Sequence, residues 1–514
     1  MSNIVLVALN ARYQHSAFGL RYLLANMAEL RPQSCLLEFE HGDVMEEVAE
    51  AIARLEPRII AISVYIWNAE ASARLVRLLK QIAPEWTVVL GGPEVSHETE
   101  AQPLVQLADY VICGEGDVAF AELCRAILAG RAPEEKILRP PLPDLQRLQL
   151  PYDEYSARDI AHRLIYVERS RGCPYRCAFC LSALDERVRL FPRHRFLQAM
   201  ADLLARGVRQ FKFVDRTFNL ATEDCVAILE FFLHHVHLGL FIHLEMVPDR
   251  LPLALRALIQ RFPAGSLQFE VGIQSFNPEV QERIERRWDR EQTINNLRWL
   301  IAESAVHLHT DLIIGLPGES LRSIADGFDQ LLALNPHEIQ VGILKRLRGA
   351  PVCRLSADYA MRFNPDPPYD LLASDQLDFL LLRRLKRFAR YWDLFGNSGR
   401  FKQLRQLFGR QGSAFEQFLQ LSDWLYATIG RTHAITLRDQ FNHLCQGLQE
   451  GSGWDRHEVI TALAIDFQHS SLTEPPECLQ GISSKKPLRP ASHLPTRQAR
   501  HRAWQEGEAA KPVA

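Results

Sequence analysis

The sequence has little of what would direct a protein to a membrane, out of the cell or onto a polyanion. Its first apolar run, residues 4–9, is too short for a membrane span or a signal peptide, and no basic segment precedes it. The 59 basic and 62 acidic side chains leave a formal net charge of only -3, which gives no sign of a polyanion-binding surface. We therefore expect a cytoplasmic protein that binds neither membranes nor nucleic acids.

The ten cysteines are too scattered through 514 residues to suggest a disulfide framework. We expect reduced thiols instead. Seven of them are interpreted as ordinary buried or surface residues: Cys35, Cys113, Cys124, Cys225, Cys353, Cys445 and Cys478. The remaining three lie together in one loop, at Cys173, Cys177 and Cys180.

The length allows about three domains at roughly 150 residues each, and the sequence pattern divides accordingly. Residues 1–133 and 164–350 alternate strand-like and helix-like stretches, and a charged, proline-rich linker, 134–163, separates them. Residues 351–480 have helical periodicity alone. The last segment, 481–514, is rich in proline, arginine and alanine, so we expect it to be disordered.

In the first segment, apolar runs typical of strands alternate with amphipathic stretches typical of helices. We predict strands at residues 4–9, 35–39, 59–65, 88–90 and 110–112. We predict helices at residues 20–30, 44–55, 69–82 and 118–128. This alternation predicts a parallel, doubly wound α/β sheet, which binds ligands at the carboxyl ends of its strands.

Polar residues and glycines follow four of these strands. Glycine lets the backbone approach a flat or anionic ligand without a Cβ clash, although the same glycines also serve ordinary strand-to-helix turns. Both interpretations stay open for these loops. The candidate ligand-binding residues are Asn10, Ser63, Gly91, Gly92, Gly114 and Glu115.

The three clustered cysteines follow a strand-like run at residues 164–167, with the spacing Cys-x3-Cys-x2-Cys. A structural zinc site would need four ligands, and an iron–sulfur cubane is normally held by four thiolates. A three-cysteine loop therefore leaves one iron of a 4Fe-4S cluster open to an exogenous ligand. A thiol cluster without metal is the disfavoured alternative.

Strand–helix units repeat from the cysteine loop onward. The strands are predicted at residues 164–167, 211–215, 241–246, 267–274, 307–315 and 338–344. The repetition predicts a (β/α) barrel, but six units are too few to close an eight-stranded one, so we expect a partial (β/α)6 barrel. Chemistry is expected on the loops that follow the strands.

On these residues, the central region resembles the radical SAM (S-adenosylmethionine) catalytic domain. The cysteine spacing matches, and Phe179 stands where the family has an aromatic residue that packs on adenine. The order of the loops in residues 1–133 resembles the flavodoxin-like (Rossmann-like) cobalamin-binding domain that precedes many radical SAM enzymes. The cobalt-ligating motif of that domain, Asp-x-His-x-x-Gly, is absent, because His15 has Tyr13 two positions before it. The resemblance implies either cobalamin bound without that histidine or a domain that has lost the cofactor.

The resemblance also implies a 4Fe-4S cluster on the three cysteines, with SAM chelated to the open iron and cleaved reductively to a 5'-deoxyadenosyl radical. A cellular reductant such as flavodoxin or ferredoxin would supply the electron. The residues that the family pattern places around SAM are Phe179, Asp215, Glu270, Gln274, Ser275 and Gly315. Asp215 would accept a hydrogen bond from the SAM ammonium group.

Two of these residues have a structural alternative. The alternative for Asp215 and Glu270 is ion pairing inside the barrel, since buried charges are usually paired. The basic residues considered as partners are Lys212, Arg216 and Arg287.

Helical periodicity predicts helices at residues 376–394, 403–408, 414–429, 436–448 and 459–467. This all-helical domain resembles the C-terminal extension of an uncharacterised subgroup of cobalamin-domain radical SAM proteins, which implies no substrate. Within it, the aromatic stretch 390–401 favours packing against the barrel over a lid.

The resemblance implies a radical SAM enzyme that either functionalises a carbon directly or, with methylcobalamin, methylates an unactivated carbon. A non-catalytic iron–sulfur regulatory protein stays open as an alternative. So does a methylthiotransferase-like modification enzyme, which would need a second cluster on three further N-terminal cysteines. Cys35, Cys113 and Cys124 are too dispersed to suggest one.

Anaerobic reconstitution with iron and sulfide is expected to load about four irons per chain, because three thiolates can hold a cubane whose fourth iron stays open. Iron and acid-labile sulfide analysis of the desalted protein measures this. One zinc per chain without labile sulfide would contradict a cluster.

Overall fold

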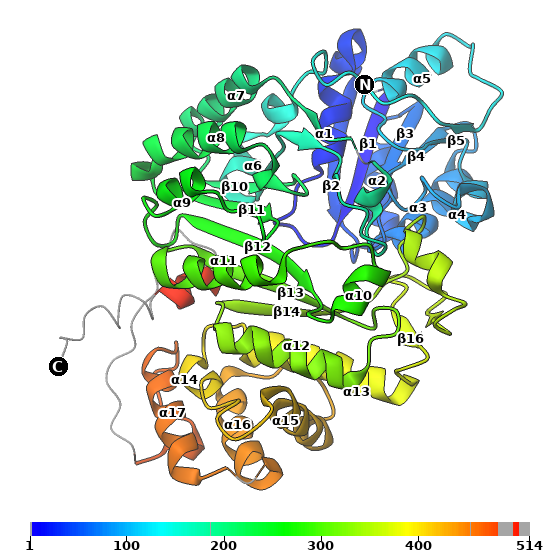
Figure 1. Cartoon of the computed structure of the whole chain (residues 1–514). Helices are drawn as coiled ribbons and strands as arrows, with labels where there is room; N and C mark the ends of the chain where they lie inside the picture. The colour runs from blue at the N-terminus through cyan, green and yellow to red at the C-terminus, as the bar shows by residue number, and fades with distance from the viewer. Residues whose placement is uncertain (1–2, 186, 453, 482–496, 503–514) are drawn as a thin grey trace. The chain divides into compact units, whose positions relative to one another are not determined.

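The computed structural model describes residues 3–185, 187–452, 454–481 and 497–502 (Figure 1). The chain folds as two compact units. The first comprises the chain up to Asp215 together with Lys345–Cys353 and Asn364–Asp370. The second comprises Arg216–Leu344, Arg354–Phe363 and the chain from Leu371 onward.

A parallel sheet forms the centre of the first unit. Its strands are β1 (Ile4–Asn10), β2 (Ser34–Glu40), β3 (Ile59–Ser63), β4 (Thr87–Gly91), β5 (Tyr110–Ile112) and β6 (Ile137–Leu138). Their order across the sheet is β2-β1-β3-β4-β5-β6, so the strand order reverses between β1 and β3. This is the flavodoxin-like order, and it confirms the predicted doubly wound sheet.

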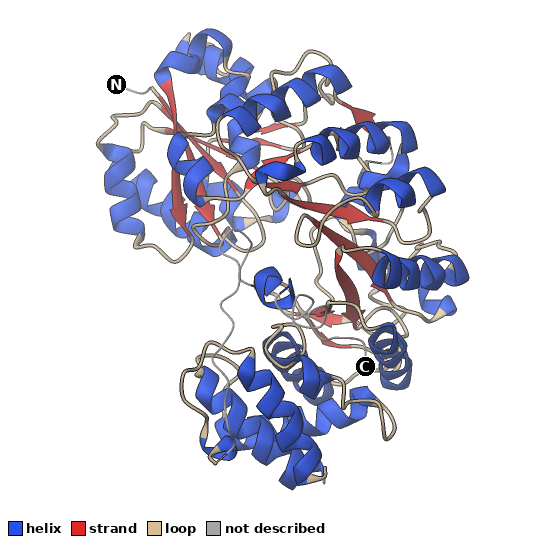
Figure 2. Ribbon diagram, turned by 90° about the vertical axis from the view of Figure 1, so that its left-hand side faces the viewer, coloured by secondary structure: helices blue, strands red, loops and turns tan. Residues whose placement is uncertain are grey.

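Helices cover both faces of this sheet (Figure 2), because successive strand residues point to opposite sides. On one face, alternate residues of β1 from Val5 to Leu9 pack with α2 (Met45–Ala53), α3 (Ala69–Ile82) and α4 (Pro103–Leu107). On the other face, those from Ile4 to Ala8 pack with α1 (Phe18–Ala25) and α5 (Ala119–Leu128). Burial on both faces explains why the strands read as continuous apolar runs.

The segment 134–163, expected to be a linker, contributes to the sheet. The N–H groups of Val111 and Cys113 on the β5 side donate to the carbonyls of Lys136 and Leu138, each at 2.9 Å. Strand β6 therefore forms the edge of the sheet. Prolines exclude a central strand but not an edge strand, so their presence did not reveal this one.

The barrel sheet contains the predicted strands in chain order. They are β7 (Ile165–Val167), β10 (Gln210–Phe213), β11 (Phe241–Met246), β12 (Leu267–Gln274), β13 (His307–Ile314) and β14 (Glu338–Ile343). The order across the sheet is β14-β13-β12-β11-β10-β7, and the pairings within each unit are parallel. The connecting helices include α7 (Arg193–Ala205), α8 (Thr222–His234), α9 (Leu253–Ile259), α10 (Pro278–Arg283), α11 (Arg290–Glu303) and α12 (Leu321–Leu334). The predicted six-stranded partial barrel is confirmed.

The C-terminal region is mainly helical, as predicted, but it is not all-helical, because β15 (Arg362–Phe363) and β16 (Leu371–Ala373) form a short antiparallel pair that the sequence pattern did not indicate. Its helices are α13 (Phe379–Phe395), α14 (Lys402–Arg405), α15 (Ala414–Ile429), α16 (Leu437–Ser452) and α17 (Arg456–Gln468). Trp392 of α13 packs edge-on against Phe328 of α12, with ring centroids 4.7 Å apart, so the aromatic stretch packs against a barrel helix. Within the described ranges, no helix is both long and apolar enough to cross a membrane.

Part of the expected disordered tail, 481–514, is instead a short helix at residues 497–502. Residues 482–496 and 503–514 lie outside the described residues. The proline and arginine content that suggested disorder does not reveal the contacts that this short helix makes.

The short helix docks against the amino ends of barrel strands. Arg497 pairs with Glu338, the first residue of β14, at 2.8 Å. Ala499 packs against Phe241, the first residue of β11, and both are buried. His501 is buried with its Nε2 3.1 Å from the carbonyl oxygen of Asn397.

Buried His501 should make the second unit sensitive to acid. Burial and the neighbouring His307 lower the pKa of His501 from 6.5 to about 3. Because the unfolded chain takes up the proton first as the pH falls, this group should lower the free energy of unfolding by about 2 kcal/mol between pH 7 and pH 5. The His501→Gln variant keeps a hydrogen-bond donor for the Asn397 carbonyl but has no titrating group at this position. Its free energy of unfolding should therefore fall by about 2 kcal/mol less than that of the wild type between pH 7 and pH 5. Urea unfolding at both pH values measures the difference, and equal pH dependence of the two proteins would contradict it.

Candidate functional site

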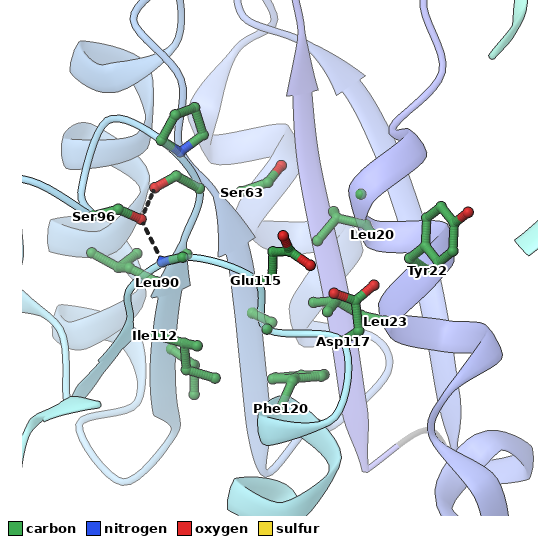
Figure 3. Close-up of a pocket in the computed structure, with 18 of the residues that line it drawn as sticks. Leu20, Tyr22, Leu23, Ser63, Leu90, Ser96, Ile112, Glu115, Asp117 and Phe120 are labelled. Atoms are coloured by element: carbon green, nitrogen blue, oxygen red, sulfur yellow. Dashed lines mark hydrogen bonds between the residues drawn. The ribbon is translucent and has the colours of Figure 1, made fainter. Parts of the chain in front are cut away.

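A cavity of about 370 Å³ lies at the carboxyl edge of the first sheet (Figure 3). Small-molecule sites usually measure roughly 300–1,000 Å³. The wall combines the loops after β3, β4 and β5 with residues of α1 and α5. Of the predicted residues, Ser63, Gly91, Gly92, Gly114 and Glu115 line it.

Asn10 is not among the residues that line this cavity. Its side-chain amide donates to the carbonyl of His15 at 3.1 Å and to Glu38 Oε1 at 3.2 Å. His15 Nδ1 in turn lies 2.6 Å from the Tyr166 hydroxyl, and burial lowers the pKa of His15. The imidazole of His15 is therefore engaged in a hydrogen bond with Tyr166.

Sequence reasoning missed the apolar wall of the cavity. Leu20, Tyr22 and Leu23 of α1 line it, together with Ile112 and Phe120 (Figure 3). A signal was present, because α1 carries more apolar residues than one core-facing stripe requires. An apolar wall opposite glycine loops suits a large, flat ligand.

Two glycine loops, those after β4 and β5, form the other wall. Gly92 has a φ of +108°, and a Cβ there would lie 2.5 Å from the Val64 carbonyl oxygen, so glycine is required. The Ser96 hydroxyl donates to the Gly92 carbonyl at 2.8 Å and accepts from the Gly114 N–H at 3.0 Å (Figure 3). Ser96 thus ties the two loops together.

The cysteine loop belongs to the same unit as the cavity. It leaves β8 (Ser170–Arg171) and returns to β9 (Arg189–Leu190), which pair antiparallel at its base. Gly172, with a φ of +89°, closes the loop so tightly that a Cβ would lie 2.2 Å from the Arg187 carbonyl. Cys173 and Cys177 are buried, and Cys180 is half-buried.

Residues that flank the cysteines reach the cavity. Arg171, which precedes Gly172, and Leu181, which follows Cys180, both line it. Arg171 Nη1 lies 2.7 Å from Glu115 Oε2. Glu115, one of the predicted ligand-binding residues, is therefore ion-paired with the base of the cysteine loop. Sequence reasoning missed the role of Arg171, because its partners in the cavity wall, Glu115 and Asp117, are distant in the chain.

Asp215 supports the strand that leads into the cysteine loop. Its buried carboxylate accepts hydrogen bonds from the Arg169 N–H at 3.0 Å and from the Ser170 hydroxyl. Burial raises the pKa of Asp215, although these hydrogen bonds oppose the rise. Phe179, within the loop, is half-buried.

One face of the barrel sheet carries ionisable pairs in the second unit. Glu270 Oε2 on β12 lies 2.9 Å from His243 Nε2 on β11. His309 Nε2 lies 3.3 Å from Asp311 Oδ1 on β13. Burial alone would lower the pKa of His309, but Asp311 raises it to about 9. Barrel interiors are normally filled with branched apolar residues, so these two pairs give this face of the sheet an unusual polar surface. Of its four ionisable residues, sequence reasoning predicted only Glu270 as a site residue.

The remaining predicted residues lie at the carboxyl ends of β12 and β13. Gln274 has a φ of +69° where the register between these strands shifts. The Ser275 hydroxyl donates to Glu319, and burial raises the pKa of Glu319 to about 7. Gly315 has a φ of +90° directly after β13.

Apart from the cysteine loop, the described part of the chain has one further group of three side chains that could supply metal ligands. These are His307, Glu338 and His501, whose ligand atoms lie within 4.8 Å of one another. Glu338 already pairs with His307 and with Arg497, each at 2.8 Å. A guanidinium on the ligand carboxylate opposes a bound cation, so we interpret this group as the anchor of the short helix at 497–502.

Three families match successive parts of the chain. Residues 4–124 match the B12 binding domain, and residues 167–331 match the radical SAM superfamily. Residues 357–506 match a protein family of unknown function, DUF4080.

Two curated relatives are similar in sequence to part of the chain. The cobalamin-dependent radical SAM methyltransferase TokK of Streptomyces tokunonensis is 27% identical over 346 residues, 60% of this chain and 49% of that protein. The 2-(S-pantetheinyl)-carbapenam-3-carboxylate methyltransferase of Streptantibioticus cattleyicolor is 28% identical over 359 residues, 60% of this chain and 50% of that protein. The chain spans about half the length of these curated relatives.

Solved structures share the fold. The cobalamin-dependent S-adenosylmethionine radical enzyme OxsB, with aqua-cobalamin and S-adenosylmethionine bound, has a TM-score of 0.62 at 12% identity and covers 90% of this chain and 78% of that one. The radical S-adenosylmethionine methyltransferase TsrM of Kitasatospora setae, with tryptophan and a SAM analogue bound, has a TM-score of 0.59 at 18% identity and covers 74% of this chain and 80% of that one.

Substituting Gly92 by alanine should destabilise the first unit and distort the cavity wall, because its Cβ would overlap the Val64 carbonyl. Gly130→Ala is a matched control, since Gly130 also has a positive φ, +69°, but nothing lies within 4 Å of its Cβ position. We expect Gly92→Ala to cost about 2 kcal/mol more than Gly130→Ala, as overpacking usually does. Denaturant unfolding of both variants measures this, and equal costs would contradict the close approach at Gly92.

Proposed function

We propose that this chain, a member of the radical SAM superfamily with a B12-binding domain before its partial barrel, is a cobalamin-dependent radical SAM enzyme that methylates an unactivated carbon. One observation carries the proposal. Arg171 and Leu181, on either side of the cysteine motif, line the same cavity as the glycine loops of the first sheet. A cluster on the cysteines and a ligand in the cavity would therefore be neighbours. The two relatives named as methyltransferases support this reaction class.

The lining of the cavity suits one part of cobalamin by its chemistry. The apolar wall from α1 would contact the flat corrin ring, and the glycine loops would let the backbone approach it closely. His15 is hydrogen-bonded to Tyr166 and does not line the cavity, so cobalamin would be held without the Asp-x-His-x-x-Gly histidine. The residues proposed to hold it are Ser63, Gly91, Gly92, Gly114 and Glu115. When bound, methylcobalamin supplies the methyl group.

The cysteine loop suits a 4Fe-4S cluster, because its three thiols come from one loop whose base is closed by Gly172 against Arg187. The proposed ligands are Cys173, Cys177 and Cys180, which leave one iron open to SAM. The proposed SAM contacts are Phe179, Asp215, Glu270, Gln274, Ser275 and Gly315. Reduced cluster and SAM together supply the one-electron chemistry that breaks an unreactive C–H bond. The chain's own part is to orient these groups, and Asp215 does so by fixing the backbone ahead of the cysteines.

The proposed reaction needs two partners, a one-electron donor of the flavodoxin or ferredoxin class and a substrate. The methylthiotransferase alternative is less well supported. Cys113 packs in the core on one face of the first sheet and Cys124 in the core on the other, so these thiols do not converge on a second cluster.

Reconstituted wild-type protein is expected to retain hydroxocobalamin through a desalting column and to release 5'-deoxyadenosine from SAM when dithionite is added. The Cys173→Ser variant should lose the release of 5'-deoxyadenosine, because two thiolates do not hold the cluster. Visible absorption spectra and chromatography of the products measure the two outcomes.

The matched control is Cys353→Ser, since Cys353 lies in the same unit but outside the cysteine motif. This variant should behave like the wild type. A protein that carries a complete cluster and binds SAM, yet never cleaves it with any candidate substrate, would favour the regulatory alternative instead.

A further inference from the structure

Arg171 is a nearly buried side chain, 13% exposed, in the wall of the cavity and close before Cys173. Its guanidinium pairs with three carboxylates, two on one loop of the first sheet and one three residues before Arg171 itself. Nη1 lies 2.7 Å from Glu115 and 2.8 Å from Asp117, and Nη2 lies 2.9 Å from Glu168. A lysine could not make this forked set of contacts.

The three carboxylates are divided between the cavity and the cysteine loop. Glu115 and Asp117 stand on the loop after β5 and line the cavity, where they lie side by side in Figure 3. Glu168 directly follows β7, the strand that leads into the cysteine loop. Arg171 therefore joins the floor of the cavity to the start of the cysteine loop.

The far end of the cysteine loop is held in the same way. Arg189 on β9 pairs with Glu115 and, at 3.1 Å, with Asp185. The Asp185 carbonyl accepts the Cys173 N–H at 2.9 Å. Both ends of the loop thus depend on Glu115, a residue of the cavity wall.

The ion pairs of Arg171 are largely shielded from water, so their strength depends on whether a ligand occupies the cavity beside them. Burial raises the pKa of Glu168 to about 7, although Arg171 opposes the rise. The guanidinium also lies 4.7 Å from the ring centroid of Tyr22, another residue of the wall. A ligand that packs on Tyr22, Glu115 or Asp117 would therefore change the position of the Arg171 guanidinium. Because that guanidinium pairs with Glu168, the position of Glu168 would change with it.

We propose that Arg171 is a positioning residue that couples the two cofactor sites, so that corrinoid binding in the cavity and cluster binding on the cysteine loop strengthen each other. The inference rests on the proposed function. A corrinoid holds the loop after β5 against Arg171, and the guanidinium in turn holds Glu168 and the start of the cysteine loop. By linkage, each cofactor changes the affinity for the other by the same factor.

The test is an anaerobic titration of hydroxocobalamin, followed by visible absorption, into protein with and without the reconstituted cluster. In wild-type protein, the cluster should tighten corrinoid binding about tenfold, within the usual range of coupling between sites. In Arg171→Lys the ratio should fall to about one, because the charge stays but the forked contacts do not. The electron paramagnetic resonance spectrum of the reduced cluster should change on corrinoid addition in the wild type and not in the variant.

Arg31→Lys is the matched control. Arg31 makes a two-pronged contact with Glu154, at 2.9 and 2.6 Å, in the same unit and away from the cavity lining. This variant should keep the wild-type ratio. Asp117→Asn, which removes one charge with little change of shape, should lower the ratio as Arg171→Lys does. Thermal melting and iron content establish that each protein is folded and loaded.

A wild-type ratio of one, or equal ratios in wild-type and Arg171→Lys proteins, would overturn the coupling and leave the proposed function in place. A comparable loss in Arg31→Lys would overturn the particular role of Arg171. Wild-type protein that binds no corrinoid in either state would overturn the proposed function, and the inference with it.

Discussion

Parallel pairing of strands is the constraint on which both candidate sites depend. Parallel neighbours cannot be joined by a short hairpin, so each strand is followed by a crossover helix and the loops after the strands gather at one edge of the sheet. In the first sheet, this brings Ser63 and Gly91, the last residues of β3 and β4, and Gly114 of the loop after β5 into one cavity wall. The cysteine loop follows β7, at the corresponding end of a strand of the barrel sheet. The backbone pairing thus decides where both candidate sites lie.

Buried charge imposes a second level of order. A carboxylate taken out of water needs a cation or several donors to replace its hydration. Asp215 meets this need with the backbone N–H of Arg169 and the hydroxyl of Ser170, and Asp117 meets it with the guanidinium of Arg171. Such contacts contribute little net stability against an apolar core. Their value here is geometric, because they restrict the backbone next to the cysteines to one arrangement.

Much of the fold could be predicted because it repeats with a simple period. The strands at 241–246 and 267–274 and the helices at 69–82 and 414–429 coincide with the predicted ranges, since their apolar patterns reflect burial directly. The errors lie where long-range contacts decide. Strand β6 forms among prolines because the edge of β5 offers hydrogen-bonding partners, and residues 497–502 are ordered by contacts with Glu338 and Phe241, far away in sequence.

By itself, the sequence determined the order of the α/β units, the three-cysteine spacing, and the glycines that follow the strands. These properties depend on covalent spacing and on local periodicity. Only the tertiary structure decided that α1 supplies an apolar wall, that Asn10 bonds to Glu38 and His15 instead of lining the cavity, and that Arg171 pairs with Glu115 and Asp117. The physical reason is that solvent exclusion and ion pairing act through space, between residues whose separation along the chain carries no local signal.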